Sequence, residues 1–361
     1  MYDDPTQVIR FFGLTKSQLR ILFSLEALMV RNDAMEKERI LNRINPFAGK
    51  HDKKKQWLER FIKETENYLK GTEPFFEDEM LYPLQYPNTL WMLKNEISNL
   101  SRKNDDTSWK YKIFMECALF IPYYPLSEED ATAKTYKNLA WDEDKRKVSL
   151  KVVAEILGVD PKLADKYKKT FKDAIGEMEG KLKKILLTGL IVAVIGGLLV
   201  IPFIGPIAAA IAPTGLYGAA AISSGLAALG GGALAAGGFG IMGGIAVIIG
   251  GGFILGGGVG TSLAIAVSDP KAIMFAGGKI AVVVKDILIG QFNNRDLAFK
   301  VLEQVKEQES NLQKLLLRIE KENIIADSNI DPKKQKKNLK ESIEMLSKLI
   351  DFLKKILGIS K

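Results

Sequence analysis

The chain has only one cysteine, Cys117, and one histidine, His51, among its 361 residues. A single cysteine excludes an intramolecular disulfide and any metal site built from several thiolates, and it fits a reducing compartment. A single histidine excludes a metal site made of several imidazoles and a histidine-relayed triad closed within the chain. His51 itself lies in the lysine-rich stretch GKHDKKK, which is typical of a solvated side chain.

Motifs of nucleotide and acyl-transfer chemistry are also missing. GFGIMG at 238–243 matches the spacing of a dinucleotide fingerprint, but no strand precedes it and no acidic residue follows before Asp269. GGK at 277–279 lacks the upstream glycine and the following Ser or Thr of a phosphate-binding loop, and no G-x-S-x-G elbow occurs. We therefore expect that the protein is not an enzyme and has neither a metal site nor a cofactor.

Charge is absent from residues 185–268, a run of 84 residues without Asp, Glu, Lys, Arg or His that contains most of the 32 glycines. A bilayer-spanning helix needs about 20 mostly apolar residues, so this run has room for two to four crossings. Soluble proteins seldom contain such a run, because its outer surface would also be apolar. We interpret residues 181–268 as a membrane-inserting region with two spans, or four, and Ile185–Ile204 as the first span.

Lysines flank the uncharged run on both sides, and the positive-inside rule places such residues in the cytoplasm. Both ends of the run are then cytoplasmic, which requires an even number of crossings. The flanking lysines are Lys181, Lys183 and Lys184 before the run and Lys271, Lys279 and Lys285 after it.

Glycines recur at four-residue spacing in the second half of the run. On a helix, small residues at this spacing share a face and let a second helix approach closely. In so glycine-rich a sequence the same spacing also arises by chance, and both interpretations stay open. The glycines of this predicted packing seam are Gly240, Gly244, Gly252, Gly256 and Gly260.

Residues 1–180 are predicted to form a helical domain, since alternating strand patterns are absent and all four tryptophans lie there. Gly158 is expected to end one helix, and Asp160 with Pro161 to begin the next. Residues 110–130 and 145–171 resemble the short helices of tellurite-resistance (TerB-like) domains, with Ser-Glu-Glu at 127–129 matching a helix start of that family. Pro-Tyr-Tyr at 122–124 replaces its acidic or glycine residues, which puts metal binding in that loop in doubt. An ordinary helical bundle is the alternative.

Residues 269–293 are predicted to form an amphipathic helix at the membrane interface, or a helix buried inside a soluble fold. Residues 294–361 are predicted to form an antiparallel helical hairpin with apolar seams. The first seam has one fault, at Glu309. Its positions are Ala298, Leu302, Val305, Glu309, Leu312, Leu316 and Ile319, followed in the second helix by Leu339, Ile343, Leu346, Ile350, Leu353 and Leu357.

Four lysines, Lys333, Lys334, Lys336 and Lys337, crowd the start of the second hairpin helix. The helix dipole disfavours cations at that end, so we expect an anionic counterpart such as phospholipid headgroups. A solvated charged face is the alternative. The overall class is therefore all-α, with a soluble helical N-terminal domain, a glycine-rich transmembrane helical hairpin and a C-terminal antiparallel helical hairpin.

This layout resembles pore-forming proteins with colicin-like hairpins and the membrane effectors of prokaryotic abortive-infection systems. The resemblance implies an antiviral toxin-like effector that a sensor protein triggers, that assembles as a homo-oligomer in the membrane and that depolarises the cell. A net charge of +8 favours anionic phospholipid as partner, while basic clusters without interleaved aromatics make nucleic acid an unlikely one. The first residues, MYDDPTQVIRFF, indicate no signal peptide.

We expect the cell membrane as location, with both termini cytoplasmic, or the cytoplasm before activation. Two other functions stay open at this point. The uncharged run could anchor a non-toxic helical scaffold, or a soluble protein could sequester it in its core or in an oligomer.

Overall fold

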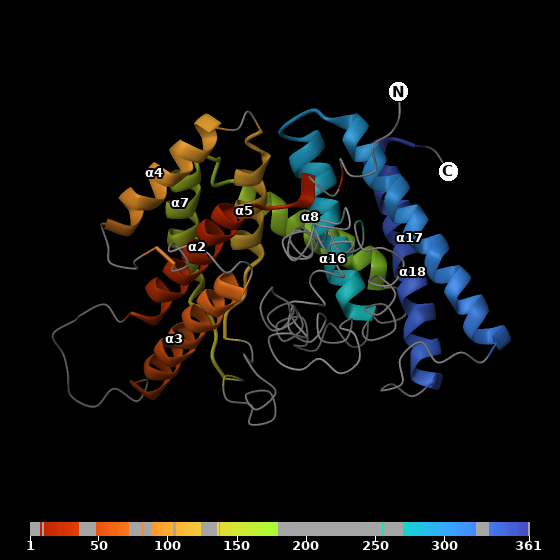
Figure 1. Ribbon diagram of the computed structural model, residues 1–361, viewed down its shortest axis with the longest axis horizontal. Helices are drawn as coiled ribbons and strands as arrows, with labels where there is room; N and C mark the ends of the chain where they lie inside the picture. Colours follow the sequence, from red (N-terminus) through yellow and green to blue (C-terminus); the bar gives the residue numbers. More distant parts are fainter. Residues whose placement is uncertain are drawn as a thin grey trace. The chain divides into compact units, whose positions relative to one another are not determined.

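The computed structural model describes residues 8, 11–35, 48–71, 81–82, 88–103, 106–123, 136, 138–179, 255, 270–322 and 332–359. All regular structure in these residues is helical, which confirms the predicted all-α class (Figure 1). The described helices include none with both the length and the apolar character that a bilayer crossing requires. The predicted spans lie outside the described residues, apart from Leu255. The chain divides into two compact units. The described residues between 16 and 165 belong to one unit, and those between 8 and 15, between 166 and 179, at 255 and between 270 and 359 belong to the other.

The N-terminal unit, residues 16–165, is built around two helices that are buried on nearly all sides. α2 (Lys16–Ala34) is buried from Ile21 to Val30, and α5 (Ser108–Leu119) is buried over most of its length. Such helices have no solvent-facing stripe and must be covered by others. The covering helices are α3 (Ala48–Gly71), which packs on α2, and α7 (Glu143–Leu157), which packs on α2, on α5 and on α4 (Asn88–Lys103).

Aromatic side chains fill the space between α3 and the segment that follows α5. Trp57 stacks on Phe61 with ring centroids 5.0 Å apart, and it meets Tyr123 edge-on at 5.5 Å. Phe120 lies 5.8 Å from Trp141 in a T-shaped pair. All four tryptophans of the chain belong to this unit.

The connection between α7 and α8 (Leu163–Glu179) has the local signals that the sequence predicts. Gly158 ends α7 in the left-handed conformation, at φ 69°, where a side chain would be strained. The Asp160 carboxylate accepts a hydrogen bond of 2.9 Å from the backbone N–H of Lys162. Gly158 is thus confirmed as the end of α7, whereas α8 begins at Leu163, two residues after the predicted first helical position, Pro161. The boundary between the two units falls inside α8, at Asp165/Lys166.

The C-terminal unit is organised around one long buried helix. α16 (Pro270–Val282) continues without a break into η4, a π-helix at Val283–Ile289. Every residue from Ile273 to Val284 is buried. Of the two interpretations of residues 269–293, this burial matches the helix in the interior of a fold.

Two long helices, α17 (Arg295–Glu322) and α18 (Pro332–Leu357), cover this buried helix. They run antiparallel, because the Arg295 guanidinium donates to the carbonyl of Leu357 at 2.6 Å and Lys340 pairs with Glu320 at 3.0 Å. Most positions of the seam predicted from the sequence are buried, and Glu309, Leu316 and Ile343 are half-buried. The starts of α16 and α18 and the end of α17 lie at the same end of the unit (Figure 1).

Candidate functional site around the uncharged segment

The helices that precede and follow the uncharged segment touch each other. α8 ends at Glu179, shortly before the segment, and α16 begins at Pro270, directly after it. A Cβ atom built on Gly277 would lie 2.8 Å from the Met178 sulfur, and one on Gly278 would lie 2.7 Å from the Phe171 ring. At Gly277 the close atoms belong to the flexible end of Met178, which can move aside. At Gly278 they belong to the rigid Phe171 ring, so this glycine is the one that lets α8 approach α16 closely.

The contacts also show the direction in which α8 crosses its partner. Met178, at the end of α8, lies against Gly277 near the start of α16. Lys166, more than three turns earlier in α8, lies against Asp286 in η4, with the Lys166 nitrogen 3.5 Å from a carboxylate oxygen. α8 thus runs against the direction of α16 and η4. As a result, Glu179 at the end of α8 and Pro270 at the start of α16 lie toward the same end of the helix pair.

Asp286 is a fully buried acid at the other end of this pair. Burial raises the pKa of its carboxyl group, while the Thr170 hydroxyl, Lys166 and Lys285 act in the opposite direction. These three groups do not compensate the carboxylate fully. The ion pair to Lys166 is longer than a close hydrogen bond, and neither carboxylate oxygen has a well-formed hydrogen bond to the described residues.

The backbone around Asp286 is also irregular, because η4 is a π-helix. The backbone N–H of Gly290 donates to the carbonyl of Lys285 at 3.1 Å, a spacing of five residues instead of four. Short π-helical segments inside α-helices occur frequently at functional sites.

The flanking lysines predicted from the sequence have different surroundings. Lys279 is buried, and its ammonium lies 5.3 Å from the centre of the Phe275 ring, while Lys285 is half-buried. For Lys271 the structure describes the backbone only. Lys181, Lys183 and Lys184 and the predicted glycine seam (Gly240, Gly244, Gly252, Gly256 and Gly260) lie outside the described residues.

The lysine cluster at the start of α18 is at the surface. Lys333, Lys334 and Lys337 are exposed and Lys336 is half-buried. Lys337 lies 4.0 Å from Glu341, and the first turn of α18 contains no acidic residue. The cluster lies at the end of the C-terminal unit where α16 begins (Figure 1).

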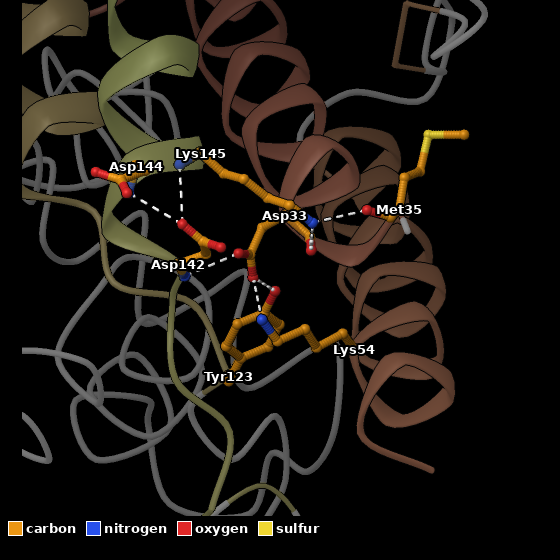
Figure 2. Close-up of polar contacts among 7 residues, drawn as sticks. All are labelled: Asp33, Met35, Lys54, Tyr123, Asp142, Asp144 and Lys145. Carbon is orange, nitrogen blue, oxygen red and sulfur yellow. Dashed lines mark hydrogen bonds and ion pairs between the residues drawn. The ribbon is translucent and has the colours of Figure 1, made fainter. Parts of the chain in front are cut away.

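A second polar cluster, in the N-terminal unit, was not predicted from the sequence (Figure 2). The buried carboxylate of Asp33 accepts hydrogen bonds from the Tyr123 hydroxyl, from the Lys54 ammonium at 2.6 Å and from the backbone N–H of Asp142 at 2.9 Å. Lys145 donates to the backbone carbonyls of Asp33 and Met35. Asp33 therefore joins α2 to α3, to the segment after α5 and to the start of α7.

This Asp33 cluster has the properties of a structural clamp. Tyr123 has φ 68°, a left-handed conformation that is rare for a bulky residue, and burial raises the pKa of its hydroxyl group.

In the part of the chain that the structure describes, no group of three or more His, Cys, Asp or Glu side chains could hold a metal ion. Residues 127–129, which carry the TerB-like resemblance, lie outside that part.

No family model, curated protein or solved structure matches this chain. Function therefore has to be inferred from the residues and from their contacts.

Proposed function

We propose that this protein is a membrane effector whose residues 185–268 insert into a lipid bilayer as a helical hairpin, permeabilise it and depolarise the cell. The contact between α8 and α16 supports this proposal best. It joins the two helices that flank the uncharged segment, and an even number of crossings returns the chain to the side from which it left. Two crossings satisfy this condition most simply, and four satisfy it as well.

Other features fit the same function. The glycine seam from Gly240 to Gly260 would let inserted helices pack closely, because lipid supplies no hydrophobic drive between helices. Homo-oligomers would then form within the membrane. The N-terminal unit is the part on which a sensor protein would act to release the hairpin, as in a toxin-like effector of prokaryotic antiviral defence.

A disulfide between α8 and α16 should leave permeabilisation intact. Met178→Cys and Gly277→Cys, in a Cys117→Ala background, place two thiols at residues that touch. We expect the oxidised protein to release dye from anionic vesicles within about twofold of its reduced form, because a hairpin does not need its two ends to separate. Dye release on addition of protein measures this directly.

The control is the same chain without residues 185–268, which should release no dye. Loss of release on oxidation, with recovery on reduction, would contradict a hairpin with joined ends. If no full-length form releases dye, the non-toxic scaffold or the sequestered soluble protein becomes the better interpretation.

The lysine cluster of α18 should provide attraction to anionic lipid. Changing Lys333, Lys334, Lys336 and Lys337 to Gln should weaken binding to anionic vesicles by at most about 1 kcal/mol per lysine. The loss should shrink at high salt, and binding to neutral vesicles should hardly change. Folding should not suffer, since these lysines oppose the dipole of their own helix. Vesicle co-sedimentation at low and high salt measures the effect.

The chain offers a control with the same change in charge. Lys306, Lys348, Lys354 and Lys355 lie in the half of the α17–α18 pair away from Pro332. Their ion pairs involve partly exposed side chains and contribute little. Changing these four to Gln should weaken vesicle binding much less. An equal loss in both variants would show that only net charge matters.

A further inference from the structure

Asp286 is a buried charge of the C-terminal unit with little around it to compensate that charge. Its side chain is 0% exposed, and its two oxygens have no well-formed hydrogen bond to the described residues. The nearest cation, Lys166, is itself 48% exposed and 3.5 Å away. A buried charge without good partners destabilises the state that buries it. The ionised carboxylate of Asp286 therefore destabilises the packing of α8 against η4.

The charged groups around Asp286 come from two elements. Lys166 belongs to α8, together with the Thr170 hydroxyl, and Lys285 belongs to η4. In α16, the ammonium of Lys279 lies at the Phe275 ring. Among the described residues, no charged side chain of α17 or α18 is one of the groups that act on Asp286. Protonation of Asp286 removes this charge, and exposure to water would solvate it.

We propose that Asp286 is a proton-binding site that determines how firmly the first turns of α8 pack against η4. When Asp286 is protonated, the neutral carboxyl group fits the buried position. When it is ionised, the carboxylate is better solvated by water, and Lys166 and Thr170 tend to separate from η4. Met178 and Gly277, at the other end of the pair, remain in contact.

The pH dependence has a definite sign. Burial raises the pKa of Asp286 above its ordinary value of 3.8, so the packed state binds the proton more tightly than the open state. The added stability is complete below the ordinary pKa and disappears as the pH rises through the raised one. The packing of α8 on η4 is thus weaker at neutral pH and firmer in acid.

The Asp286 site lies where α8 enters the C-terminal unit. Lys166 is the first residue of the C-terminal unit within α8, so the chain arrives from the N-terminal unit just before it. Release of the first turns of α8 frees a longer stretch between the two units. The proton bound at Asp286 would therefore set how many residues of α8 pack within the C-terminal unit.

Hydrogen exchange of the full chain without membranes tests this proposal. It is measured at a mildly acidic pH and at neutral pH, with intrinsic exchange rates corrected. In the parent chain, amides of residues 166–172 should exchange faster at the higher pH. In Asp286→Asn they should be protected at least about fivefold more than in the parent at the higher pH, with no remaining pH dependence.

Asp173→Asn is the matched control, because Asp173 is an exposed acid on the same helix and its loss should leave the parent pattern unchanged. Lys166→Gln should move the midpoint of the pH dependence upward in the parent and have no effect in Asp286→Asn. Faster exchange in Asp286→Asn than in the parent, or the same pH dependence in both, overturns the proposal. If Asp286→Asn does not fold, an unchanged midpoint in Lys166→Gln overturns it.

This inference does not rest on the proposed membrane function. Exchange in solution reports the α8–η4 contact alone, and dye release from vesicles reports permeabilisation alone. Either proposal can therefore fail while the other stands.

Discussion

Replacing Asp33 with alanine should destabilise the N-terminal unit by about 3 to 5 kcal/mol, the cost of removing one partner from a buried ion pair. The substitution leaves the Lys54 ammonium, the Tyr123 hydroxyl and the backbone N–H of Asp142 without their common acceptor. The Lys54 side chain is only 11% exposed, so water cannot fully replace the carboxylate. Hydrogen exchange of the buried amides of α2 under native conditions measures the loss.

Two substitutions calibrate this effect. Tyr123→Phe removes one hydroxyl donor and leaves the other two contacts of Asp33 in place, so it should cost about 1 kcal/mol. Asp144→Ala removes an exposed acid whose ion pair with Lys147 is 3.9 Å long, and it should cost less than about 1 kcal/mol. If Asp33→Ala is as mild as Asp144→Ala, the Asp33 cluster is not a clamp.

Gly278→Leu should destabilise the C-terminal unit by about 3 kcal/mol or more, the upper part of the range for overpacking. Even the first carbon of the new side chain would meet the Phe171 ring at 2.7 Å and Ile175 at 3.2 Å. α8 would have to move away from α16, since both Phe171 and Gly278 lie in regular helices. Amides of α8 and α16 should lose protection together in hydrogen exchange.

Gly176 provides the control for this substitution. It lies in α8, and a Cβ atom there would meet nothing within 4 Å. Gly176→Ala should therefore stabilise α8 by up to about 1 kcal/mol. Adding Phe171→Ala to Gly278→Leu should restore part of the lost stability by making space. If Gly278→Leu is tolerated as well as Gly176→Ala, the glycine is not required for the helix contact.

The features that could be predicted from the sequence are those set by neighbouring residues. Gly158 and the Asp160–Pro161 pair mark a helix boundary because capping depends on local backbone groups. The repeat of apolar residues in α17 and α18 predicts their buried faces, since helical spacing alone decides which side chains share a face.

The features that could not be predicted depend on contacts between distant parts of the chain. Asp33 lies 21, 90 and 109 positions from Lys54, Tyr123 and Asp142, and no spacing rule connects them. Gly277 and Gly278 look like weak points of a helix in the sequence, because the approach of α8 is visible only in three dimensions. From the sequence, Asp286 is expected on the exposed polar face of an amphipathic helix, whereas in the structure it is buried.

The distribution of tryptophan has a practical consequence for spectroscopy. Trp57, Trp91, Trp109 and Trp141 all belong to the N-terminal unit, so indole fluorescence reports that unit and no other part of the chain. Trp91 is 66% exposed whereas Trp57 and Trp109 are almost fully buried, so a soluble quencher should reach Trp91 first. A shift in emission when lipid is added would therefore record a response of the N-terminal unit. A tryptophan introduced between residues 185 and 268 would add the first optical signal from the uncharged segment itself.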